Sequence, residues 1–161
     1  MTLIQGESPA ATPFERDKTF ALRFVTFQEL KSSLLKVFGP SASAIVYDAG
    51  IEPGRKSCLR LLKACKTNEE ILAVLVNRKA SQNWGRLVFD NVDWQGHSGK
   101  VFVVKSFESR EIQSREPSCY FFKGYLVGFL SELFQTEVAV SENRCEAIGD
   151  HRCEFAFREP Q

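Results

Sequence analysis

The chain has 161 residues, a formal net charge of +1, 43% hydrophobic residues and five cysteines. This length fits one domain with a sizeable core, and the basic residues are too scattered to form a nucleic-acid-binding surface. No apolar run reaches the ~18 residues needed to span a bilayer, and no signal peptide is visible. Without a secretory context, we expect a cytoplasmic protein whose cysteines are reduced or bind metal.

The N-terminal region divides into a tail and the start of a domain. Residues 1–18 contain two prolines and no hydrophobic periodicity, so they are predicted to be a disordered tail, and residues 19–161 to be one domain. A short strand is expected over residues 21–25. An amphipathic helix follows, and Gly39 with Pro40 ends it.

Two further helical regions are expected before the hydrophobic spacing changes from a helical to an alternating pattern near residue 84. The first spans residues 41–65, and Pro53 with Gly54 should kink or break it, because proline removes a donor and clashes with the preceding turn. The second opens with Thr67 and Glu70, whose spacing is typical of a capping box.

The second half of the chain is predicted to form mainly strands. Residues 84–94 and 100–108 are predicted strands joined by a turn at 96–99, and the second is apolar on both faces, which indicates a central strand. A largely apolar helix over residues 119–135 and two short closing strands follow. The pattern predicts a mixed α/β (α+β) fold, an antiparallel sheet covered by helices. Strands and helices do not alternate along the chain as they do in a parallel sheet.

Three thiols and one carboxylate are expected to converge near the C-terminus. Between residues 136 and 142, Val138, Val140 and Glu142 share one face of a predicted strand, so Glu142 follows the two valines into the core. A buried carboxylate needs a cation or several donors. The predicted zinc site, closed and structural, consists of Cys119, Glu142, Cys145 and Cys153. His151 is the alternative fourth ligand, because imidazole commonly accompanies thiolates.

These residues carry a specific resemblance. The spacing Cys-x22-Glu-x2-Cys-x7-Cys, the GYLVG helix segment and the closing C-x-F strand resemble the 4-vinyl reductase, or hydrocarbon-binding, domain family. Weaker similarities are the VYDAG run at residues 46–50, the WG pair at 84–85 and the KSFES run at 105–109. The family includes zinc-containing sensor domains of phenol- and toluene-responsive bacterial activators, and its spacing favours Glu142 over His151.

The resemblance also implies an apolar ligand pocket between the sheet and the helices. Phe107 stands where the sensors carry a pocket tryptophan, and Val140 stands where they carry a pocket tyrosine. Both substitutions remove a polar group, the indole N–H and the phenol hydroxyl, from the pocket wall. We therefore expect a hydrocarbon-like ligand, or a filled core, rather than a phenol. Further wall residues are expected from the apolar helix and the first strand: Phe121, Tyr125, Phe129 and Trp84.

The function predicted from these features is a zinc-containing sensor or carrier of a small apolar ligand, without catalytic activity. The resemblance implies a homodimer. Because no DNA-binding or ATPase domain is visible in this sequence, we expect a signalling output to come from a partner protein or from a part of the protein outside this sequence. One alternative is an assembly module, because the domain is distantly similar to small subunits of the TRAPP tethering complex. Another is an accessory factor in tetrapyrrole 4-vinyl reduction, although the chain has no flavin, nicotinamide or iron–sulfur motif.

Overall fold

The structure, a computed structural model, describes residues 21–160, so the predicted tail lies outside the described residues. The helices are α2 (Phe24–Phe38), η1 (Gly39–Ser41), α3 (Ala42–Leu62), α4 (Asn68–Ser81), α5 (Tyr120–Phe134) and η2 (Glu146–Ile148). The strands are β1 (Arg86–Asp93), β2 (Ser98–Val104), β3 (Ala139–Arg144) and β4 (Cys153–Arg158). Within this part of the chain, no helix is both long and apolar enough to cross a membrane.

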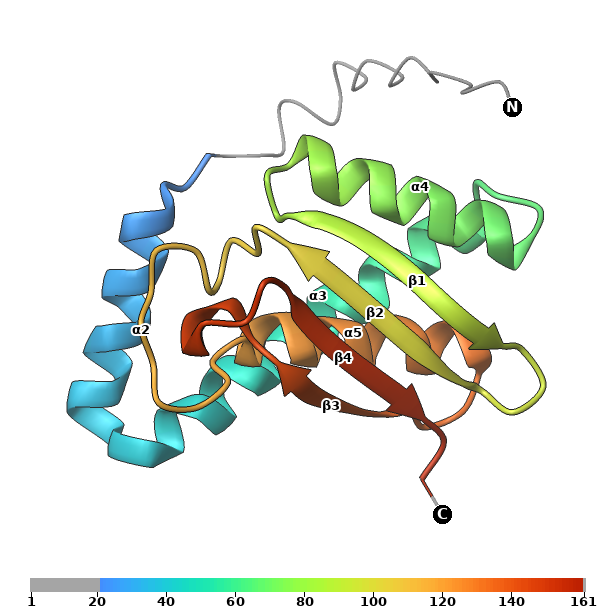
Figure 1. The fold of residues 1–161 in the computed structure, drawn as a ribbon. Coiled ribbons are helices and arrows are strands. Elements are labelled where there is room, and N and C mark those ends of the chain that lie inside the picture. The colour runs from blue at the N-terminus through green and yellow to red at the C-terminus, as the bar shows by residue number, and fades with distance from the viewer. Residues whose placement is uncertain (1–20, 161) are drawn as a thin grey trace.

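The four strands form one antiparallel sheet in the order β1-β2-β4-β3, with helices α3 and α5 behind it (Figure 1). Strand β2 pairs with β1 and β4, which confirms the central position expected from its two apolar faces. The face toward the helices is buried at Val101, Val103 and Phe155, whereas Val88 on the opposite face is 55% exposed. The predicted α+β class, an antiparallel sheet covered by helices, is confirmed.

Helices α3 and α5 pack backbone against backbone. A Cβ on Gly124 would clash with the carbonyl oxygen of Tyr47, and a Cβ on Gly50 would clash with that of Phe121. The same relation holds for Gly128 and Gly54 one turn further along. Glycine lowers helix propensity by about 1 kcal/mol relative to alanine, and this close approach offsets that loss. The glycines of the α5 segment therefore serve helix packing.

Helix α3 is continuous from Ala42 to Leu62, so the expected break at Pro53 does not occur, and the alternative of a kink there stays a prediction. Proline removes one hydrogen-bond donor. The flanking Gly50 and Gly54 are buried against α5, and this packing stabilises α3 on both sides of Pro53. Tertiary contacts here outweigh the local preference.

Two other sequence predictions are also corrected. The expected strand at residues 21–25 is absent, because Phe24 opens α2 and packs on the core together with Phe27. Strand β2 ends at Val104, so residues 105–109 form a loop instead of continuing the strand.

The capping box at α4 is confirmed in its main contact. Thr67 Oγ1 accepts a hydrogen bond from the Glu70 amide at 3.2 Å, and the Glu70 carboxylate accepts one from the Lys66 amide at 2.8 Å. These contacts satisfy free donors at the helix start. The buried face of α4 consists of Ile71, Leu72, Leu75 and Lys79.

Candidate metal centre and aromatic cluster

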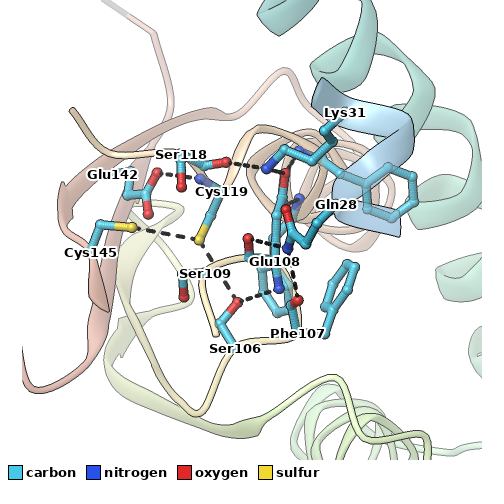
Figure 2. Close-up of polar contacts among 12 residues, drawn as sticks. Gln28, Lys31, Ser106, Phe107, Glu108, Ser109, Ser118, Cys119, Glu142 and Cys145 are labelled. Carbon is cyan, nitrogen blue, oxygen red and sulfur yellow. Dashed lines mark hydrogen bonds and ion pairs between the residues drawn. The ribbon is translucent and has the colours of Figure 1, made fainter. Parts of the chain in front are cut away.

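Four side chains from separate elements meet at one end of the sheet. Cys119 caps α5, Glu142 lies on β3, Cys145 follows β3, and Cys153 opens β4. One ligand atom from each lies within 4.8 Å of all the others. We call these four residues the thiol cluster. Its three cysteines are buried, and Figure 2 shows Cys119, Glu142 and Cys145 facing one another.

The sulfur separations match a tetrahedral metal. Cys119 Sγ lies 3.8 Å from Cys145 Sγ and 3.6 Å from Cys153 Sγ, and the third separation is 4.0 Å. A zinc ion with Zn–S bonds of about 2.3 Å places its sulfur ligands about 3.8 Å apart. A disulfide would require about 2.05 Å, so all three thiols are free. The residues present fit a structural zinc ion.

The electrostatics of the cluster also favour a cation. Burial raises the pKa of the Glu142 carboxyl to about 8, and the adjacent Cys145 adds to this rise. Hydrogen bonds from Cys119 and Cys153 strongly lower the pKa of Cys145. Glu142 Oε1 is buried without a hydrogen-bond partner among the described residues, while Oε2 accepts from the Cys119 amide at 3.1 Å. A divalent cation would stabilise the ionised carboxylate and thiolates together.

His151, the alternative fourth ligand, is exposed and does not belong to the thiol cluster. It lines a surface depression of about 300 Å³ together with Lys105, Arg110, Glu111 and Asp150. The geometry therefore favours Glu142.

The loop of residues 105–109, which we call the linking loop, is bound to the thiol cluster through Glu146. The Glu146 carboxylate accepts from the Lys105 amide at 2.7 Å, from the Ser106 amide at 3.0 Å and from Ser109 Oγ at 3.1 Å. The Glu146 amide donates to Cys153 Sγ at 3.4 Å, and Ser109 Oγ lies 3.3 Å from the same sulfur. The thiol cluster and the linking loop thus share one hydrogen-bond network.

On its other side the linking loop is anchored by Glu108, which is fully buried. Its carboxylate accepts from the Phe121 amide at 3.0 Å and the Phe122 amide at 2.8 Å, at the start of α5. It also pairs with Lys31 of α2 at 2.9 Å (Figure 2). Burial raises the pKa of Glu108, whereas Lys31 and the two amides favour the carboxylate. A helix N-terminus adds to this preference for an anion.

Between Glu108 and Ser106, Phe107 points into a group of rings that we call the aromatic cluster. Its ring centroid lies 4.9 Å from that of Trp84 and 5.2 Å from that of Phe27. Trp84 in turn lies 5.0 Å from Tyr125. The cluster consists of Phe27, Trp84, Phe107, Phe121, Phe122 and Tyr125.

The structure brings together four of the six predicted ligand residues: Trp84, Phe107, Phe121 and Tyr125. Phe129 is fully buried and stacks on Tyr125 at 6.2 Å, one turn further along α5. Val140 lies on edge strand β3, half-buried and outside the aromatic cluster. The role of all six residues in ligand binding stays a prediction. The rings contact one another, and none of them lines the surface depression of about 440 Å³ beside Gly128 or the one of about 300 Å³ beside His151.

Sequence reasoning missed three members of this region. Phe27 does not stand out in the sequence because residues 21–25 before it are expected to form a strand. Phe122 does not stand out because the apolar pattern of α5 does not determine which of its rings face the sheet. Lys79 lies on the buried face of α4, with its Nζ 3.4 Å from the centroid of the Trp84 ring and 4.3 Å from that of Tyr125. Its spacing of four from Leu75 and eight from Ile71 was the available signal.

The chain has an α+β fold similar to that of 4-vinyl reductase and TRAPP-like domains, and a Cys/Glu cluster lies near its C-terminus. Residues 100–159 match the family model of the 4-vinyl reductase domain, which confirms the resemblance seen in the sequence. A search of curated proteins found no match.

Three solved structures have folds similar to that of this chain. The phenol-responsive sensory domain of the transcription activator PoxR, solved with phenol, is similar at a TM-score of 0.77 and 16% identity, over 88% of this chain and 76% of that one. A vinyl-4-reductase family protein from Methanocaldococcus jannaschii is similar at 0.65 and 20% identity, over 97% and 100% of the two chains. A trafficking protein particle complex subunit 3 from Naegleria fowleri, covalently bound to palmitic acid, is similar at 0.64 and 14% identity, over 86% and 93%.

Proposed function

We propose that this protein is a zinc-containing domain that binds a small apolar ligand, as a sensor or carrier and without catalysing a reaction. The observation that carries the proposal is the linking loop, which connects the thiol cluster to Phe107 in the aromatic cluster. Zinc held by Cys119, Glu142, Cys145 and Cys153 has four protein ligands, so it stabilises the fold and leaves no position for an activated water.

The similarity to a phenol-responsive sensory domain supports this interpretation of the fold. In this chain, the aromatic cluster offers large apolar surfaces from α2, α5 and two loops, and it reaches the protein surface at Phe27, Trp84 and Phe121, which are half-buried. Apolar burial provides about 25 cal/mol per Å² before the costs of binding, so without polar contacts we expect an affinity of roughly micromolar at best.

Metal analysis of chelator-free protein tests the zinc site. We expect one zinc per chain, and Glu142→Gln should weaken zinc retention, whereas His151→Ala should leave it unchanged. The zinc site is contradicted if the purified protein contains no zinc and all five cysteines react as free thiols. This must hold for both native and denatured protein.

Titration with a fluorescent hydrophobic probe tests the ligand site. We expect one probe per chain, displaced by small aromatics or acyl chains, and Phe107→Ala should change which ligand size binds best while zinc content stays intact. Phe134→Ala is the matched control, because Phe134 lies at the far end of α5 against Trp94. Absence of stoichiometric binding by the parent protein would refute the ligand site.

An assembly role is the second candidate, favoured by the apolar surface of α2. Val25, Leu30, Val37 and Phe38 are 56%, 55%, 73% and 52% exposed. This much exposed apolar surface on one helix is typical of an interface. We expect a homodimer through α2, which light scattering at micromolar concentration should show as twice the 18.2 kDa chain mass. Leu30→Glu should then yield the monomer, while a monomeric parent protein would refute the dimer.

A further inference from the structure

Lys79 is a buried amine beside the aromatic cluster. The residue is 6% exposed, and its ammonium lies against the faces of Trp84 and Tyr125. Its one hydrogen-bond acceptor among the described residues is the Gln82 side-chain oxygen at 3.3 Å. Among residues 21–160, no carboxylate lies within ion-pair distance of Lys79.

The charges around Lys79 make this position unfavourable for the protein alone. Burial lowers the pKa of Lys79 to about 7, and the positive charges of Arg60 and Arg78 add to the effect. A buried ammonium needs a paired anion or several acceptors, and ring faces compensate for this only in part. The ammonium form of Lys79 is therefore disfavoured unless an anion pairs with it.

A second polar group faces the same region. The Tyr125 hydroxyl is buried, and within the described part of the chain no group makes a hydrogen bond of normal length and angle with it; Ser57 is the one side chain that lowers its pKa as a hydrogen-bonding neighbour. Buried hydroxyls are nearly always paired in folded proteins. The Lys79 ammonium lies 4.3 Å from the centroid of the ring that carries this hydroxyl, so the two groups can bind one carboxylate.

We propose that the ligand of the aromatic cluster carries a carboxylate, which pairs with Lys79 while its apolar body lies among Trp84, Phe107 and Phe121. This inference rests on the proposed ligand-binding function and specifies the class of ligand. It also revises the expectation of a purely hydrocarbon-like ligand, because the polar group lost at the Phe107 and Val140 positions is replaced by an amine from α4.

The test compares acids with alcohols of the same shape. In a Trp94→Phe background Trp84 is the only tryptophan, and its fluorescence is titrated with decanoate and decanol, then with benzoate and benzyl alcohol. We expect each acid to bind at least tenfold more tightly than its alcohol, the order of a buried charge-assisted pair. The two tails distinguish an acyl from an aromatic body.

Variants assign the preference to Lys79. Lys79→Met should abolish the preference for acids and leave alcohol affinity within about threefold, whereas Lys79→Arg should retain it. Lys79→Gln serves as a second neutral variant if methionine alters folding, as judged by thermal unfolding and zinc content. Lys123→Met is the matched control, since Lys123 lies on α5 with its Nζ 5.3 Å from the centroid of the Tyr47 ring, outside the aromatic cluster.

The outcomes separate this inference from the proposed function. Equal binding of acids and alcohols, or a preference that survives in Lys79→Met, overturns the carboxylate inference and leaves the apolar site intact. If neither acids nor alcohols bind, the ligand-binding function itself fails, and the inference fails with it.

Discussion

The buried pair between Lys31 and Glu108 should couple α2 to the rest of the domain. We predict that Lys31→Met and Glu108→Gln each lower the free energy of unfolding. The double variant should lose clearly less than the sum of the two single losses. The side chains of Lys31 and Glu108 are 10% and 0% exposed, and the Nζ–Oε1 distance is 2.9 Å. At an effective dielectric constant of about 20, this separation corresponds to an attraction of about 6 kcal/mol before desolvation is subtracted.

The size of each effect follows from what remains after the substitution. Lys31→Met leaves a buried carboxylate that still accepts from the Phe121 and Phe122 amides, so we expect a loss of about 3 kcal/mol, the lower end for a broken buried pair. Glu108→Gln leaves Lys31 bound to the Ser118 carbonyl oxygen at 2.8 Å, and we expect about 2 kcal/mol. The coupling energy should be about 2 kcal/mol.

Urea denaturation of the four proteins in the cycle gives the coupling energy directly. The exposed Glu52–Arg55 pair, 51% and 45% exposed, is the matched control and should show no measurable coupling. Effects of Lys31→Met and Glu108→Gln that add to within about 0.5 kcal/mol would refute the view that this pair joins α2 to the linking loop.

Three further substitutions have defined outcomes. Cys145→Ser should remove the zinc and lower the free energy of unfolding by about 3 kcal/mol or more, since zinc binding is coupled to folding; metal analysis and denaturation on the same sample check this. Gly124→Ala should cost about 3 kcal/mol, because its Cβ would force α3 away from α5, and an unchanged melting temperature would contradict the packing. For Lys79 the folded pKa of about 7 lies below the ordinary value of 10.5, so the unfolded chain binds more protons between these values. The free energy of unfolding of the wild type should therefore rise with pH, relative to that of Lys79→Met, by at most about 1.4 kcal/mol per pH unit. Parallel plots of unfolding free energy against pH for the two proteins would contradict this.

Sequence patterns predicted the parts of this molecule that depend on local rules. The order of helices and strands from Thr67 to the C-terminus follows from a capping box, from alternation in β2 and from the apolar run of α5. The residues of the thiol cluster could be named because four ligands have a fixed spacing along the chain.

The remaining features depend on contacts between distant segments. Pro53 lies within a continuous helix, which is stabilised because Gly50 and Gly54 pack against α5. Phe24 belongs to α2 because that helix packs Phe27 on Phe107, a contact between residues 80 positions apart. The burial of Lys79 depends on how α4 lies over Trp84 and Tyr125, which no local pattern determines.

The linking loop leads to a last prediction, that zinc and ligand bind with positive coupling. Glu146 contacts Cys153 through its amide and holds the Lys105 and Ser106 amides through its carboxylate, so fixing the thiol cluster also fixes the backbone next to Phe107. Removing zinc should loosen this backbone and weaken probe binding by about fivefold or more, and bound ligand must raise zinc affinity by the same factor.

Two titrations test this coupling: the probe against zinc-loaded and chelator-treated protein, and zinc against a competing chelator with and without decanoate. Circular dichroism establishes that the chelator-treated protein is still folded. Glu146→Gln, which keeps all four residues of the thiol cluster, should reduce the coupling while one zinc is retained. If folded, zinc-free protein binds the probe as tightly as the zinc-loaded form, the two sites are independent and the linking loop does not connect them energetically.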